Sequence, residues 1–127
     1  MKVRNPGWFA LTGYSERGIL LENVVLCGSS AYEKKYYLNP EFDGLPREVK
    51  KELKMICVSY TEQIGGIFTM EYRPDGRLIL RVESKENDFE FDEIGSELKI
   101  KQIQTQHGEL MEALELYNKI IREAKKA

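Results

Sequence analysis

The residues whose types could support chemistry gather in one short stretch, CGSS, at residues 27–30. A cysteine or a serine in a loop that enters a helix can act as a nucleophile, and the backbone amides there can bind an anion. Catalysis by Cys27 also needs a base, and the single histidine, His107, falls on the apolar side of a distant predicted helix. A glycine followed by two serines is not a P-loop. The stretch is therefore more typical of a helix start than of an active site.

Ser30 and Glu33 have the spacing of a capping box, in which each side chain binds the backbone amide of the other residue. This spacing predicts a short helix over residues 31–38, which ends before Pro40 because proline cannot continue it. A strand over residues 35–38 is the alternative, since the two tyrosines in this segment favour strands.

Two tyrosines near this stretch are candidate contacts for a ligand or a partner. On the predicted helix, Tyr32 and Tyr36 would share one face and could stack on a bound molecule. Such a pair more often packs on a neighbouring element with its hydroxyls at the surface. The lysines between them would then be solvated.

The acidic residues could bind Mg²⁺ or Ca²⁺, but we expect neither them nor the two cysteines to form a metal site. Cys27 and Cys57 follow apolar residues and belong to no C-x-x-C pair, so we expect buried thiols rather than a disulfide. With one histidine, a zinc site would lack ligands unless two chains shared it. Asp88, Glu90 and Asp92 alternate along a predicted strand but lack the spacing of a calcium loop. We therefore expect no metal, no cofactor and no catalytic residue.

The elements that position these residues predict an α+β class. A small antiparallel sheet around residues 66–92 contains a hairpin of strands 67–72 and 77–84 and a third candidate strand at 88–92. The sheet packs against two amphipathic helices, at 46–64 and at 96–125. The apolar face of the first helix consists of Val49, Leu53, Ile56, Cys57, Tyr60 and Ile64.

The long last helix carries an apolar seam at heptad spacing. A straight helix over residues 96–125 would span about 45 Å. It would overhang a domain of this size, whose diameter is about 36 Å. Either Gly108 breaks the helix or its end packs on a partner chain. The seam consists of Ile100, Ile103, His107, Leu110, Leu114, Tyr117, Ile121 and Ala124.

Composition excludes some classes of protein. The chain has 127 residues, a net charge of −2 and a sequence pI near 5.6, which argues against a dedicated nucleic-acid binder. It has no apolar run long enough to cross a bilayer and no signal-peptide pattern. We therefore expect a cytoplasmic protein that does not bind a membrane. Residues 1–23 lack periodicity and are expected to form an arm outside a single domain at 24–127. Glu16, Arg17 and Gly18 would be encoded by purine-rich codons, and TTG could encode Leu21 a few codons later, which resembles a ribosome-binding site ahead of an alternative start. We therefore expect residues 1–20 to be a translated leader.

The segments VVLCGSSAYEKKYYLNPEFDGLP, ELKMICVSYTEQIGGIFTMEY and FDEIGSELKIKQIQ together resemble an uncharacterised family of short proteins. It is a domain of unknown function found in anaerobic Gram-positive bacteria. The resemblance covers about Val24 to Lys119, and the charged tail IIREAKKA departs from it. The resemblance implies no activity, cofactor or catalytic residue.

We therefore expect a non-enzymatic interaction or regulatory protein that forms a homo-oligomer, or binds an unidentified protein partner, through its last helix. The alternative is a small-molecule or anion-binding protein, or an enzyme, that uses the loop from Cys27 to Tyr32. The candidate contacts for a ligand or partner are Cys27, Ser30, Tyr32, Tyr36, His107, Leu114 and Ile121.

Overall fold

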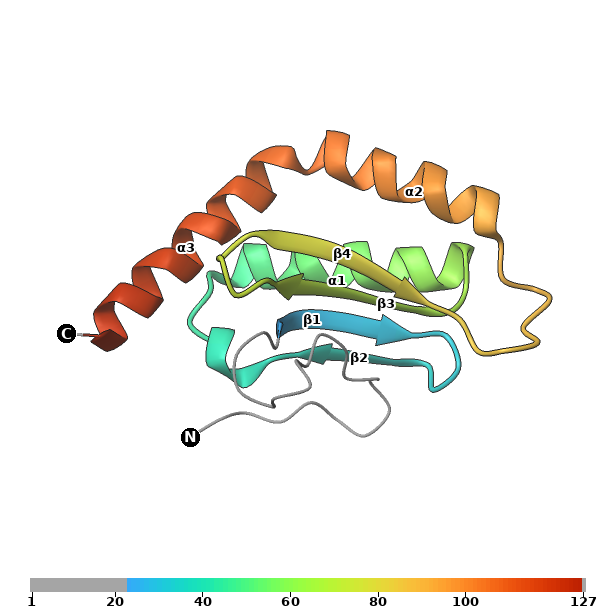
Figure 1. The fold of residues 1–127 in the computed structure, drawn as a ribbon, viewed down its shortest axis with the longest axis horizontal. Coiled ribbons are helices and arrows are strands. Elements are labelled where there is room, and N and C mark those ends of the chain that lie inside the picture. Colours follow the sequence, from blue (N-terminus) through green and yellow to red (C-terminus); the bar gives the residue numbers. More distant parts are fainter. Residues whose placement is uncertain (1–22, 127) are drawn as a thin grey trace.

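The computed structural model describes residues 23–126, and the proposed leader over residues 1–20 lies outside them. The elements in chain order are β1 (Val24–Ser30), β2 (Lys35–Leu38), the 3-10 helix η1 (Pro40–Phe42), α1 (Arg47–Gln63), β3 (Ile67–Tyr72), β4 (Leu78–Glu83), α2 (Glu93–Gln106) and α3 (Gly108–Lys126). The strands form one antiparallel sheet in the order β2-β1-β3-β4 (Figure 1). The predicted α+β class is confirmed, and the division into an arm and one domain stays a prediction.

The hairpin of β3 and β4 follows its prediction. The first strand has the predicted bounds, and the second is shortened to Leu78–Glu83. The amide of Gly76 donates to the carbonyl of Arg73 at 2.8 Å and closes the turn. Gly76 has a φ of +92°, a left-handed conformation that glycine adopts without a steric penalty. The turn residues therefore set the register of the hairpin.

The short helix predicted over residues 31–38 is wrong, and the strand alternative is correct. The amide of Glu33 does donate to the Ser30 hydroxyl oxygen at 3.1 Å, as in a capping box. This contact closes a tight turn instead of a helix, because Lys34 adopts a left-handed φ of 53° that no helix continues. The chain then returns as β2, paired with β1. Strand β1 extends to Ser30 and lies between β2 and β3 in the sheet.

The third strand predicted at residues 88–92 is also wrong. The amide of Asp88 donates to the carbonyl of Lys85 at 3.1 Å, so the segment turns. Asp92 instead begins α2, because its side chain accepts from the amide of Gly95 at 2.8 Å. The alternating acidic and aromatic residues of DFEFD therefore lie in a loop that ends at the N-cap of α2.

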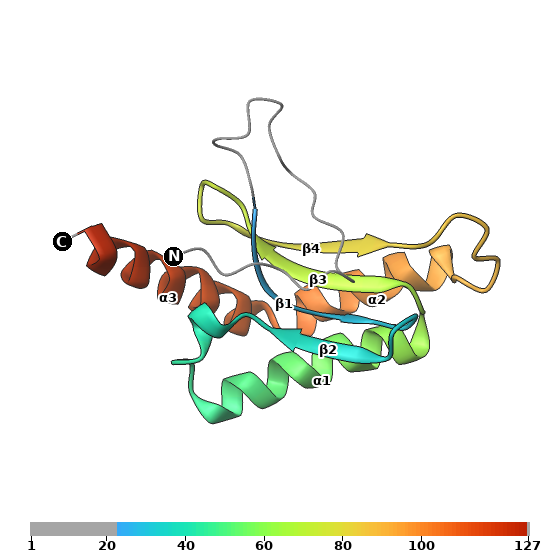
Figure 2. The same ribbon diagram turned by 90° about the horizontal axis from the view of Figure 1, so that it is seen from below.

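Helices α1 and α2 lie side by side on one face of the sheet and run in opposite directions (Figures 1 and 2). At one end of the pair, the hydroxyls of Tyr60 and Ser96 share a hydrogen bond of 2.5 Å. At the other end, the His107 Nδ1 atom lies 2.8 Å from a carboxylate oxygen of Glu52. The predicted amphipathic helix at 46–64 is confirmed as α1.

The predicted last helix is broken into α2 and α3. His107 leaves helical geometry, with φ of −117° and ψ of 25°, and α3 begins at Gly108. Of the two alternatives for the long helix, the structure thus shows the break. Helix α3 then runs past the end of the sheet (Figure 1). Within residues 23–126, no helix combines the length and hydropathy needed to cross a membrane.

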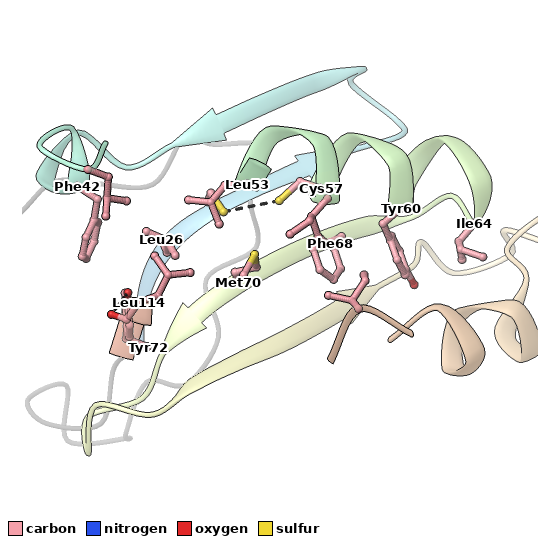
Figure 3. Packing of buried hydrophobic residues seen from close by; sticks show 14 residues of the cluster. Leu26, Phe42, Leu53, Cys57, Tyr60, Ile64, Phe68, Met70, Tyr72 and Leu114 are labelled. Carbon is pink, nitrogen blue, oxygen red and sulfur yellow. Dashed lines mark hydrogen bonds between the residues drawn. The ribbon is translucent and has the colours of Figure 1, made fainter. Parts of the chain in front are cut away.

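The core lies between the sheet and α1 (Figure 3). Strand β3 directs Phe68, Met70 and Tyr72 toward the helices, and all three are buried. The rings of Tyr60 and Phe68 stack with centroids 4.6 Å apart. Burial of each large apolar side chain contributes about 1.5–3 kcal/mol. The helix and the sheet thereby hold the β1–β2 hairpin in a fixed position against α1.

Candidate functional site

A cavity of about 690 Å³ lies between the β1–β2 hairpin and α1. Its lining combines the turn of the hairpin with one face of the second half of the helix. The polar residues of the lining are Ser29, Ser30, Lys34, Lys35, Lys54, Thr61 and Glu62. The size falls within the range of pockets for small molecules. Two of the candidate contacts named from the sequence, Ser30 and Tyr36, border this cavity.

Three lysines surround the cavity without a carboxylate partner. Lys34 lies in the hairpin turn, Lys35 begins β2, and Lys54 comes from α1. Among residues 23–126 none of them forms an ion pair, whereas Lys50 on the same helix binds Asp43 at 2.8 Å. The lysines were expected to be solvated charges, and their convergence across two elements is not visible in the sequence.

Three hydroxyl-bearing residues, Ser29, Ser30 and Thr61, belong to the cavity lining. The Ser29 hydroxyl donates to the carbonyl of Cys57 at 2.7 Å and lies 3.1 Å from the Thr61 hydroxyl. These bonds satisfy Ser29 within the fold. The Ser30 hydroxyl oxygen accepts from the Glu33 amide, and within the described chain its hydrogen has no acceptor. Ser30 is therefore the hydroxyl that retains a donor for a bound molecule.

Cys27 and Cys57, which are not among the residues that line the cavity, are both free and buried, as predicted. Their sulfur atoms lie 3.6 Å apart (Figure 3). Burial, followed by the interaction with Cys27, raises the pKa of the Cys57 thiol well above its ordinary value. Burial likewise raises the pKa of the Tyr36 hydroxyl, which lies beside both thiols. The site therefore favours protonated sulfur and disfavours a thiolate nucleophile at Cys57.

His107 is engaged away from the thiols. Its ring nitrogen contacts Glu52, which joins α1 to the break between α2 and α3. The structure therefore does not bring His107 and Cys27 together as a base and a nucleophile. Among the described residues no group of histidine, cysteine and carboxylate side chains is arranged to hold a metal ion.

Tyr32 lies apart from Tyr36, because the helix that would have aligned them is absent. Its hydroxyl donates to a carboxylate oxygen of Asp88 at 2.5 Å and accepts from the amide of Lys85 at 2.9 Å. The Lys85 ammonium also lies 4.6 Å from the centre of the ring. Tyr32 thus ties the hairpin turn to the loop before α2.

The candidate contacts on the last helix lie in different environments. Leu114 is 1% exposed and belongs to the core of its own domain, while Ile121 is half-buried. The exposed apolar residues of α3 are Leu116 and Ile120, at 58% and 57% exposure. The sequence-based prediction did not include Leu116 and Ile120, because it considered only the residues of the heptad seam. Their spacing of four residues, which places them on one side of a helix, was the available signal.

Three further exposed apolar side chains lie on the loop before α2 and on α2 itself. Phe89, Ile94 and Leu98 are all strongly exposed. The spacing of Ile94 and Leu98 also puts these two on one side of their helix. The structure therefore presents apolar side chains to solvent on both of its last helices.

Comparison with known protein families matches residues 23–126 to a group described as a family of unknown function, DUF6145. No curated protein and no solved structure matches the chain. The matched range contains every described element, and it confirms the resemblance to an uncharacterised family. The family is described without an activity.

Proposed function

For a chain that belongs to the DUF6145 family of unknown function, we propose the role of a non-enzymatic interaction or regulatory module that self-associates through α3. We also propose a cytoplasmic location, and the occurrence of the family in anaerobic Gram-positive bacteria stays a prediction. The proposal rests on one observation, the exposed apolar face of α3. This face, named here the outer face, consists of Ala113, Leu116 and Ile120.

The outer face is distinct from the side of α3 that holds the helix on its own domain. Leu114 is buried, and its backbone carbonyl accepts a hydrogen bond from the Tyr72 hydroxyl at 2.8 Å. The side chain of Glu115 accepts from the amide of Leu78 at 2.8 Å. These contacts fix the rotation of α3 about its axis. Leu116 and Ile120 are therefore directed to solvent by the fold itself and are available to a partner.

The charges of α3 favour a second copy of the chain as that partner. The exposed Glu109 and Glu112 lie in the first half of the helix, and Lys119, Arg122 and Glu123 are exposed in the second half. In an antiparallel pair centred near Leu116, Glu112 of each copy lies near Lys119 of the other, whereas Glu109 lies opposite Glu123. A parallel pair would instead place like charges together. Complementary charges of this kind select the orientation of a helix pair more than they add affinity.

The non-enzymatic part of the proposal is supported by the state of the candidate catalytic groups. Burial raises the pKa of the Cys57 thiol, which opposes formation of the reactive thiolate. His107 contacts Glu52 instead of a thiol. An interaction module needs neither group to react, and both have structural neighbours that explain their positions.

The test is the mass of the protein in solution, measured by sedimentation equilibrium over a range of concentrations. We expect a dimer for the natural sequence and a monomer for Leu116→Glu combined with Ile120→Glu. The matched control is Met55→Glu on α1, because Met55 is as exposed as Leu116, at 58%. The control should remain a dimer. Circular dichroism should show that all three proteins are folded. A natural sequence that is monomeric throughout, or a folded double variant that stays dimeric, contradicts the proposal.

A further inference from the structure

We propose that the cavity between the β1–β2 hairpin and α1 binds a small molecule through a phosphate group. This function is separate from self-association, because the cavity and α3 share no residue. The residues that carry the inference are Ser30, Lys34, Lys35, Tyr36 and Lys54. The phosphate would lie among the three ammonium groups, over the Ser30 hydroxyl.

Charge is the main argument for an anion. The lining holds three lysines and one carboxylate, Glu62, so its balance is positive in a chain whose net charge is −2. Unpaired cations that converge on a cavity repel one another, and an anion between them removes that repulsion. Lysine acts as a point charge with three rotatable donors, which suits the oxygens of a phosphate.

The backbone at the cavity supports the same assignment. Lys34 has a left-handed φ of 53°, a conformation that is costly for a residue with a side chain and is common at ligand sites. The turn that requires it is held by the bond from the Glu33 amide to Ser30 and by the bond from the Ala31 amide to the carbonyl of Gly66 at 2.8 Å. These two bonds fix the base of the turn that carries Lys34 and precedes Lys35.

The size and shape of the cavity favour a small molecule over a nucleic acid. A volume of about 690 Å³ admits a phosphate group together with an organic part of moderate size. Tyr36, Ala31 and Val58 supply apolar surface for that organic part. A nucleic-acid backbone would need cations spread along a face, whereas these three lysines meet at one concavity.

The experiment is a titration with inorganic pyrophosphate, followed by backbone amide chemical shifts at constant ionic strength. We expect saturable shifts at the residues around the hairpin turn and in the second half of α1. Lys34→Gln combined with Lys54→Gln should raise the dissociation constant for pyrophosphate about ten-fold or more, since each lysine gives a charge-assisted contact. All three lysines are exposed, so the double variant should fold normally.

The matched control is Lys51→Gln, which removes an exposed lysine of the same helix that does not border the cavity. Its dissociation constant should stay within about two-fold of the natural one, because distant surface charges are screened. Shifts that do not saturate, or an equal loss in Lys51→Gln and in the double variant, would overturn the proposal. The proposal would also be overturned if single-stranded RNA bound through the same lysines while pyrophosphate did not bind.

Discussion

The hydroxyl of Tyr72 donates a hydrogen bond to the backbone carbonyl of Leu114 at 2.8 Å, and this bond joins the end of β3 to α3 (Figure 3). Tyr72 and Leu114 are both buried. The contact explains why the heptad seam packs on its own domain after the break at His107. It also determines which side of α3 remains available to a second copy. The predictions below begin with this contact.

Replacement of Leu114 and of Leu116 by alanine should have very different effects on stability. Leu114→Ala leaves a cavity in the core and should lower the free energy of unfolding by about 2–5 kcal/mol. Leu116→Ala removes an exposed side chain and should change it by less than about 0.5 kcal/mol when measured on the monomer. Urea unfolding at low protein concentration measures both. Equal losses would show that α3 does not have the rotation described here.

Two tyrosine hydroxyls provide a second comparison. Tyr72→Phe removes the side-chain donor to the carbonyl of Leu114 and should cost about 1 kcal/mol. The Tyr36 hydroxyl oxygen is buried, and within residues 23–126 it has no hydrogen-bond partner of good geometry. Tyr36→Phe should therefore be neutral or stabilising. Urea unfolding again decides, and a larger loss for Tyr36→Phe than for Tyr72→Phe would contradict the assignment.

Adjacent glycines after α1 should respond differently to alanine. Both Gly65 and Gly66 have positive φ, at +98° and +71°, so alanine should cost about 1–2 kcal/mol at either position for conformation alone. A Cβ atom at Gly66 would also lie 2.6 Å from the carbonyl oxygen of Glu83, while one at Gly65 would meet no atom. Gly66→Ala should thus lower the melting temperature more than Gly65→Ala. The reverse order would mean that β3 and β4 do not approach as described.

The stability of the protein should fall at alkaline pH. Burial raises the pKa of Cys57 above its ordinary value of 9.0, so the unfolded chain loses this proton first. The neutral Cys57 thiol makes its full contribution to the free energy of unfolding below about pH 9. This contribution decreases as the pH rises, by up to about 1.4 kcal/mol per pH unit. Cys57→Ala should flatten the dependence of the unfolding free energy between pH 9 and 10. An unchanged slope in this variant would show that the thiol is not buried as a neutral group.

The thiols should also be unreactive in the folded protein. Because Cys27 and Cys57 are fully buried, a thiol reagent such as dithionitrobenzoate at neutral pH should modify them only as fast as the protein unfolds. The measurement is the rate of modification with and without denaturant. Rapid modification of the native protein would instead revive the reading of Cys27 as a reactive group.

Sequence patterns correctly predicted the elements whose structure is determined by residues close together in the chain. The spacing of Leu53, Ile56 and Tyr60 indicated α1, and the turn around Gly76 indicated the hairpin of β3 and β4. The segment 31–38 was mistaken because the same bond between Ser30 and Glu33 can begin a helix or close a turn. Pairing of this segment with β1 decides between them, and local propensity does not contain that information.

The candidate site was predictable only in part. Ser30 and Tyr36 were named, but the convergence of Lys34 with Lys54 depends on the packing of the hairpin against α1. The seam of the last helix was found by its spacing, yet the spacing continues through the break and marks core residues such as Leu114. The exposed face at Leu116 and Ile120 becomes visible only when the helix is placed on the sheet.

The most direct test of self-association is a cross-link between two copies at the outer face. Leu116→Cys introduces an exposed thiol, while Cys27 and Cys57 are buried and should not compete. Mild oxidation followed by non-reducing electrophoresis should convert this variant to a covalent dimer. The control, Met55→Cys, has a thiol at a position of equal exposure on α1 and should stay monomeric on the gel. Cross-linking of both variants to the same extent, or of neither, would contradict association through α3.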